Sequence, residues 1–154
     1  MAIEIERKYL VNENKLPSLI KGHHLIQGYL FNQKEKSLRV RIKDDRGYIT
    51  IKSGTDCLTR SEFEYEIPLK DAKEMILLCG NNLIDKHRYL IPHKQHIWEI
   101  DIFHGDNQGL VIAEIELKHP DEHFILPPWI DREVTQDPRY INASLVQLPY
   151  SQWE

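Results

Sequence analysis

The sequence is poor in several features that would indicate a special environment. Its 154 residues include only two cysteines, Cys57 and Cys79, whose wide separation fits no metal-binding motif and favours two reduced thiols. It contains no apolar run of about 18 residues, so we expect no membrane-spanning helix. The formal net charge of -4 offers no basic footprint for duplex nucleic acid. A strand-like pattern begins at residue 3 with no signal-peptide pattern before it, so we expect a cytoplasmic protein.

The sequence is rich in segments that alternate charged and apolar residues. Hydrophobic residues make up 41% of the chain and charged residues 29%, which is typical of a globular protein. Glu4, Glu6 and Lys8 share one parity, opposite Ile3 and Ile5. The same alternation recurs in later segments: 38–43, 49–52, 62–67, 86–88, 98–102 and 113–118. Because alternate side chains of a strand point to opposite faces, this pattern predicts half-buried antiparallel strands.

These segments and the turns between them predict mainly β structure in a single domain spanning residues 1–154. The turn sequences 44–47 and 106–109 suit hairpins. The predicted strands cover residues 3–11, 24–33, 37–45, 48–54, 61–69, 83–92, 96–104 and 110–118. Helical stretches are expected at 13–21, 71–79 and 142–148. The segment 120–139 contains four prolines and is expected to be irregular.

Consecutive antiparallel strands predict closure into a barrel, because closure removes exposed sheet edges. Alternation alone leaves two arrangements open. Charges could point outward around an apolar filling, or inward around a polar hollow whose apolar exterior helices or a partner subunit would cover. The signs are sorted by strand, since 62–66 and 99–101 are acidic whereas 39–43 and 86–88 are basic. Sorted charge is costly on a surface unless ligands compensate it, which favours the inward arrangement. The expected fold class is therefore mainly β (α+β), a closed eight-stranded antiparallel β-barrel with a few flanking helices.

The inward arrangement predicts a particular chemistry for the hollow. Guanidinium groups bind phosphate oxygens in pairs, and lysines add point charge. Clustered carboxylates without histidine or cysteine suit a hard cation such as Mg²⁺ or Mn²⁺. Basic strands opposite acidic strands thus form a site for a small-molecule polyanion bridged to a divalent metal, and a linear triphosphate is the natural occupant. Hydrolysis of that triphosphate would need positioning, charge neutralisation and a metal-activated water.

Taken together, the charged segments resemble the CYTH superfamily, the triphosphate tunnel metalloenzymes. The resemblance follows the order of the chain through Glu4-Ile5-Glu6-Arg7-Lys8, Arg39-x-Arg41, Thr50-x-Lys52, Arg60-x-Glu62-x-Glu64-x-Glu66, Lys86-x-Arg88-Tyr89, Glu99-x-Asp101, Glu114-x-Glu116 and Tyr140-x-Asn142-x-x-Leu145. Segments 27–30 and 127–129 look most like those of the short bacterial inorganic tripolyphosphatases. The resemblance implies a charged tunnel and hydrolysis of inorganic tripolyphosphate to pyrophosphate and phosphate.

The resemblance also implies roles for individual residues. Those implied to bind the triphosphate are Lys8, Arg39, Arg41, Lys52, Lys86 and Arg88. Those implied to hold one or two Mg²⁺ or Mn²⁺ ions are Glu4, Glu6, Asp101, Glu114 and Glu116. The implied supporting acidic residues are Glu62 and Glu64. Lys8 and Tyr29 are the candidate catalytic residues at the attacked or leaving phosphate, and the helix around 140–145 would plug one mouth of the tunnel.

Other functions remain open from the sequence. A class IV adenylate cyclase, or a thiamine or nucleoside triphosphatase, would use the same triphosphate site. A non-catalytic polyphosphate-binding module would need the basic lining alone, and acidic residues such as Glu4 and Glu114 argue against it because they weaken plain anion binding. The apolar outer wall also suggests a homodimer.

Overall fold

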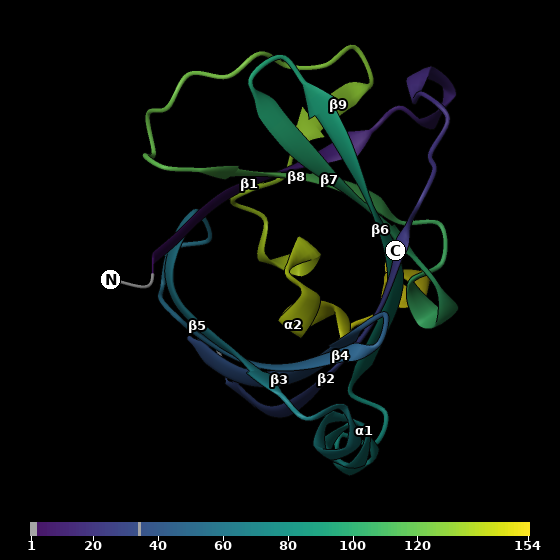
Figure 1. Cartoon of the computed structure of the whole chain (residues 1–154). Coiled ribbons are helices and arrows are strands. Elements are labelled where there is room, and N and C mark those ends of the chain that lie inside the picture. Colours follow the sequence, from purple (N-terminus) through teal and green to yellow (C-terminus); the bar gives the residue numbers. More distant parts are fainter. Residues whose placement is uncertain (1–2, 34) are drawn as a thin grey trace.

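The structure, a computed structural model, describes residues 3–33 and 35–154 (Figure 1). Within these residues nine strands form one antiparallel sheet in the order β5-β4-β3-β2-β6-β7-β8-β1-β9. The eight strands of the barrel are β1 (Ile3–Val11), β2 (His23–Gln33), β3 (Lys36–Lys43), β4 (Arg46–Ser53), β5 (Thr59–Ile67), β6 (Leu83–His93), β7 (His96–Phe103) and β8 (Val111–Leu117). A further pairing of β1 with β5 closes the sheet. The predicted eight-stranded antiparallel barrel is confirmed.

The barrel closes through a short seam on β1. One edge of this strand pairs with β8 from Ile5 to Leu10. The opposite edge pairs with β5 through three residues, among them Glu4 opposite Arg60. Further along, the same edge pairs with β9 (Ile130–Glu133). This ninth strand lies in the segment 120–139 that we predicted to be irregular, so that prediction is wrong at residues 130–133, where the chain extends beside the free edge of β1.

The helices differ more from expectation than the strands do. Helix α1 (Leu69–Leu78) confirms the predicted second helix and packs Ala72 against Val40 on the outer wall. The predicted helix at 13–21 is wrong, because Asn12 caps only the 3₁₀ turn η1 (Glu13–Lys15). Helix α2 (Asn142–Leu145) is shorter than predicted. The remaining short 3₁₀ turns are η2 (Gly105–Asn107), η3 (Pro138–Tyr140) and η4 (Tyr150–Gln152).

The interior of the barrel is divided into a charged half and an apolar half. On β1, β6 and β8 the inward row changes from charged to apolar, as Lys8 is followed by Leu10, Lys86 is preceded by Ile84, and Glu114 is preceded by Ile112. The apolar half forms a core with the C-terminal segment, in which Leu145 is fully buried. Figure 1 shows α2 inside the ring of strands. The C-terminal segment therefore closes one end of the barrel beneath the charged half.

The outward faces of the strands are apolar, as the inward arrangement of charges requires. On β1, β7 and β8 they are covered by the segment that leads to β9, where Trp98, Trp129 and Phe124 pack edge to face. On β3 to β5, next to α1, an uncovered row remains across neighbouring strands, with Ile51 and Phe63 43% and 44% exposed. No helix among the described residues is long and apolar enough to cross a bilayer.

Candidate active site

The charged half of the barrel encloses a cavity of about 290 Å³, which we call the chamber. Every residue that the sequence predicted for the site lines it except Asp101. The predicted residues in the lining are Glu4, Glu6, Lys8, Tyr29, Arg39, Arg41, Lys52, Glu62, Glu64, Lys86, Arg88, Glu114 and Glu116. The start of α2 also contributes Asn142 to the lining. With Glu99 of β7, the lining takes side chains from all eight strands of the barrel and from the C-terminal segment.

The strand register places opposite charges side by side in the chamber. Lys8 lies opposite Glu114 across β1 and β8, Lys52 opposite Glu62 across β4 and β5, and Arg88 opposite Asp101 across β6 and β7. Cross-strand neighbours of opposite charge stabilise a sheet, and here they also hold each long side chain in a fixed direction. The result is a lining in which most groups are orientated before any ligand enters.

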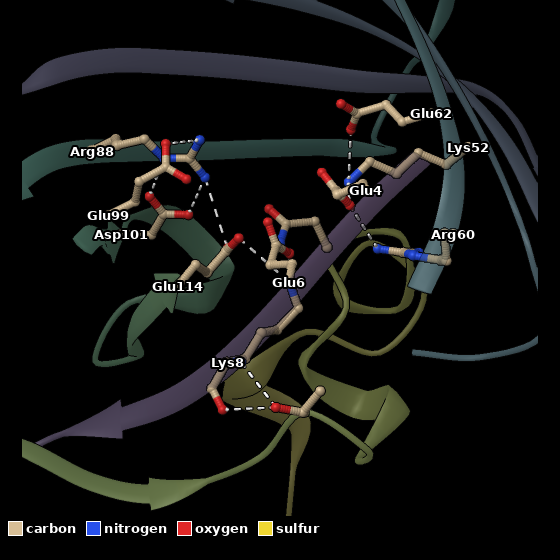
Figure 2. Close-up of polar contacts among 12 residues, drawn as sticks. Glu4, Glu6, Lys8, Lys52, Arg60, Glu62, Arg88, Glu99, Asp101 and Glu114 are labelled. Carbon is tan, nitrogen blue, oxygen red and sulfur yellow. Dashed lines mark hydrogen bonds and ion pairs between the residues drawn. The ribbon is translucent and has the colours of Figure 1, made fainter. Parts of the chain in front are cut away.

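Three carboxylates converge at one side of the chamber. Each of Glu6, Glu99 and Glu114 offers an oxygen, and these oxygens all lie within 4.8 Å of one another (Figure 2). Such an oxygen-only set suits a hard divalent cation that keeps some of its water. Glu99 was not among the metal ligands that we predicted. It joins the cluster because β7 pairs with β8 so that Glu99 lies opposite Glu114.

The cluster contains carboxyl groups of very different acidity. Burial would raise the pKa of Glu6, but Lys8 and Lys52 outweigh it and lower the pKa to about 2. Lys8 Nζ lies 2.6 Å from a Glu6 oxygen. Glu99 is the opposite case, since burial together with Glu114 and Asp101 exceeds the effect of Arg88 and raises its pKa to about 7. A cation bound among these groups would offset the repulsion between Glu99 and the neighbouring carboxylates.

Binding of a divalent cation is expected to release roughly half a proton per ion at pH 7, because Glu99 must ionise to act as a ligand. Calorimetry in buffers of different ionisation enthalpy measures that proton, and Glu99→Gln should abolish it. The raised pKa has a second consequence in the metal-free protein. The protonated Glu99 carboxyl stabilises the folded state fully below about pH 4.5, and this stabilisation is lost as the pH rises through about 7. Metal binding without proton release would contradict this account.

Glu4 and Glu116 are not among the three clustered carboxylates, although Glu116 lies opposite Glu6 across β1 and β8. Glu4 is at the β1–β5 seam, where Lys52 Nζ donates to it at 3.0 Å and an Arg60 nitrogen lies 3.9 Å away. Burial and then Glu4 and Glu6 raise the pKa of Glu116. Both line the chamber, and their predicted role as metal ligands stays a prediction.

Asp101 lies behind the chamber wall instead of in the lining. It is 0% exposed and its two oxygens accept hydrogen bonds from Arg88 Nε at 2.7 Å, Arg88 Nη2 at 2.9 Å and Lys86 Nζ at 2.7 Å. Burial would raise the pKa of Asp101, but Arg88 and Lys86 outweigh it and lower the pKa. In this arrangement Asp101 orients two cations. Its predicted role as a metal ligand stays a prediction.

Two arginines have bonding capacity that the described side chains do not use: Arg41 has no carboxylate within ion-pair distance, and Arg39 has a buried donor without an acceptor. The one side-chain hydrogen-bond partner of Arg41 in the described part of the chain is the neutral Gln27, at 3.1 Å. Burial, with Arg39 and Arg88 nearby, lowers the pKa of Arg41 to about 10. Arg39 is paired at 3.6 Å with Glu64, yet its buried Nε has no partner. Buried donors without acceptors are costly, so this side of the chamber is suited to an anion with several oxygens.

Comparisons with known proteins agree with this geometry. The CYTH domain family matches residues 2–148. An inorganic triphosphatase of Acetivibrio thermocellus is 46% identical over 155 residues, which cover 100% of this chain and 99% of that protein. An inorganic triphosphatase of Nitrosomonas europaea is 33% identical over 150 residues, covering 92% of this chain and 95% of the relative. A crystal structure of the inorganic triphosphatase NE1496 superposes with a TM-score of 0.69 and 31% identity, covering 95% of each chain.

Proposed function

This chain belongs to the CYTH domain family, and from that premise we propose that it is a metal-dependent triphosphatase that hydrolyses inorganic tripolyphosphate to pyrophosphate and phosphate. The observation that carries the proposal is a single chamber that holds a carboxylate cluster beside Arg41, which pairs with no described carboxylate, and Arg39, whose buried Nε lacks an acceptor. A polyanion bridged to a divalent cation satisfies both features at once. The two inorganic triphosphatases to which the chain is similar along nearly its whole length support the same reaction.

The basic residues of the chamber bind the phosphate groups at different positions. Arg39 and Arg41 bind phosphate oxygens, and Lys52, Lys86 and Arg88 complete the cradle. Lys8 Nζ lies within 3.5 Å of Glu114 as well as beside Glu6, so it can neutralise phosphate oxygens next to the carboxylate cluster. Tyr29, which also lines the chamber, is the second proposed catalytic residue.

A divalent cation would be held by Glu6, Glu99 and Glu114, with Glu4 and Glu116 as further ligands. When bound, it supplies charge neutralisation and a water of lowered pKa. We propose Mg²⁺ or Mn²⁺, because the available donors are carboxylate oxygens and both ions prefer oxygen ligands.

A substrate panel tests the proposed function. Purified protein should release phosphate and pyrophosphate from tripolyphosphate with Mg²⁺ or Mn²⁺ and release none with a chelator. Glu4→Ala, which removes a chamber carboxylate, is the comparison variant. Formation of cyclic AMP from ATP would indicate a cyclase instead. Tight binding of tripolyphosphate without turnover would indicate a non-catalytic binding module.

A second cavity favours organic triphosphates as alternative substrates. This cavity, of about 550 Å³, shares Ser37, Lys52 and Arg60 with the chamber. Its lining includes uncharged polar groups such as Thr55 and Gln136. A nucleoside or thiamine moiety attached to a triphosphate could occupy it. A kcat/KM for ATP or thiamine triphosphate at least equal to that for tripolyphosphate would select this alternative.

Substrate and metal together are expected to raise the melting temperature by about 5–10 °C at concentrations about 100-fold above Kd. The physical reason is that the metal-free chamber holds mutually repelling carboxylates and unpartnered arginine nitrogens in the folded state. Calorimetric or fluorescence melting with tripolyphosphate and Mg²⁺, against a chelated sample, makes the measurement. Superimposable melting curves would contradict the proposed site.

We further propose that the chain forms a homodimer through the uncovered apolar row on its outer wall. Phe31, Leu38, Ile51 and Phe63 lie opposite one another in register across β2 to β5. Phe63→Glu should convert a dimer to a monomer in light scattering. Ile97→Glu, at an exposed position of β7, should leave the mass unchanged. A wild-type protein that is monomeric at micromolar concentration would refute the dimer.

A further inference from the structure

Asn142, at the start of α2, reaches from the C-terminal segment to the cations of the chamber. Its Oδ1 accepts a hydrogen bond from Lys86 Nζ at 2.8 Å and a second one from Gln27 Nε2 at 3.1 Å. Gln27 Oε1 in turn accepts from Arg41 Nε at 3.1 Å. The four side chains thus form one continuous chain of hydrogen bonds that runs through β6, α2, β2 and β3.

The orientation of both amide groups in this chain is dictated by their neighbours. Lys86 and Arg41 can only donate hydrogen bonds. Each must therefore face an amide oxygen, which leaves the NH₂ group of Gln27 to donate to Asn142. The side chains are also well enclosed, since Gln27 is 0%, Lys86 1% and Asn142 8% exposed. A buried network in which Lys86 Nζ, Gln27 Nε2 and Arg41 Nε each meet an acceptor restricts the positions of its members.

The uncharged character of the two amides distinguishes them from the other partners of the chamber cations. Lys8, Lys52 and Arg88 are held by carboxylates, which orient the cation but also offset part of its charge. Lys86 is held by Asp101 as well as by Asn142. An amide oxygen orients a cation and leaves its full charge available to an anion. Arg41, held only by Gln27 among the described side chains, is the clearest case.

Resting on the proposed function, we propose that Asn142 and Gln27 are positioning residues, an uncharged relay that aims Lys86 and Arg41 at the triphosphate. The C-terminal segment would then complete the substrate site in addition to closing the barrel. Attachment of α2 does not depend on Asn142. Asn32 Nδ2 donates to the carbonyl of Ala143 at 2.8 Å, and Leu145 is buried in the apolar core.

Single and double alanine variants of the relay provide the first test. Asn142→Ala and Gln27→Ala should each raise KM for tripolyphosphate about tenfold, because each removes an acceptor for a charged donor, and kcat should change less than KM. The double variant should be no worse than the more impaired single variant, because both break one chain. Asn32→Ala, which loosens α2 without touching the relay, should keep KM within about twofold. Equal effects of Asn32→Ala and Asn142→Ala, or additive effects in the double variant, would overturn the relay.

Gln27→Glu is a second test that does not depend on the alanine variants folding. The substitution keeps the shape of the side chain and adds a charge beside Arg41. The new carboxylate pairs with Arg41 but loses the hydrogen bond that Gln27 Nε2 donates to Asn142. The variant should stay folded and bind tripolyphosphate about tenfold or more weakly, because the charge of Arg41 is then offset. Unchanged affinity in the folded variant would overturn the relay.

Calorimetric titration of each protein with tripolyphosphate, with metal present and with metal chelated, separates the relay from the function on which it rests. A wild-type protein that neither binds nor hydrolyses tripolyphosphate overturns both proposals. A wild-type protein that does both, with variants that bind equally well, overturns the relay alone. Weaker binding by the relay variants, with Asn32→Ala unchanged, is the result expected.

Discussion

Glu114→Gln is expected to lower the rate of tripolyphosphate hydrolysis at least about 100-fold while the barrel stays folded. Glu114 is one of the three clustered carboxylates and also lies 3.5 Å from Lys8 and 3.8 Å from Arg88. Glutamine has the same shape but offers a cation one neutral oxygen in place of a negative carboxylate. Because the substitution removes a negative charge that repels those of Glu6 and Glu99, the folded state should lose little stability.

The control for this prediction is Glu66→Gln. Glu66 lies on β5 and is paired with Arg46 at 3.4 Å in an exposed ion pair outside the chamber lining. The same substitution there should leave the rate within about threefold, since exposed ion pairs contribute little. Rates are measured as phosphate release over a range of Mg²⁺ and Mn²⁺ concentrations. Equal activity of Glu114→Gln and the wild type would show that the cluster holds no catalytic ion.

Asp101→Asn is expected to destabilise the fold by about 3–5 kcal/mol, the cost of leaving a buried charge without its partner. The carboxylate takes all three hydrogen bonds described above from Lys86 and Arg88, and it is completely buried. In asparagine an NH₂ group replaces one oxygen and meets donors that cannot accept its hydrogens. Urea unfolding monitored by tryptophan fluorescence measures the loss.

Acid pH should produce a related loss in the wild-type protein. The pKa of Asp101 is lower in the folded protein than its ordinary value, so the stabilisation is present above about pH 4 and is lost as the pH falls further. Asp137→Asn is the matched control. Asp137 pairs with Arg139 at 2.8 Å on the surface and caps η3, a task that asparagine performs equally well. A change of no more than about 1 kcal/mol is expected there. Similar stabilities for the two variants would contradict the positioning role of Asp101.

The positions of the strands, and the side of the sheet to which each side chain points, were predictable because polar and apolar residues alternate along a half-buried strand. Glu62, Glu64 and Glu66 alternate with apolar neighbours, and β5 has bounds within two residues of the prediction. The single residue pairs that β9 makes with β1 leave no such pattern, and the prolines around it favoured an irregular segment. The helix predicted at 13–21 failed because Asn12 caps a single turn and Pro17 follows soon after, so no second turn forms.

For the candidate site, the sequence could predict only which side chains point into the barrel. Alternation places Glu99 and Asp101 on one face, but it does not tell how deep each lies along the barrel. The register of β7 against β8 brings Glu99 to Glu114, and Asp101 lies one step deeper, where two cations enclose it. Gln27 and Asn142 carry no charge, so a pattern based on charge could not reveal that they hold Arg41 and Lys86.

A crystal structure of the protein with tripolyphosphate and Mn²⁺ tests the central claim most directly, because the anomalous signal of manganese locates the ion independently of the protein map. The account predicts a manganese peak among Glu6, Glu99 and Glu114, with the triphosphate extending from it toward Arg39 and Arg41 inside the chamber. Manganese and triphosphate bound only on the outer wall, with the chamber containing solvent alone, would contradict it.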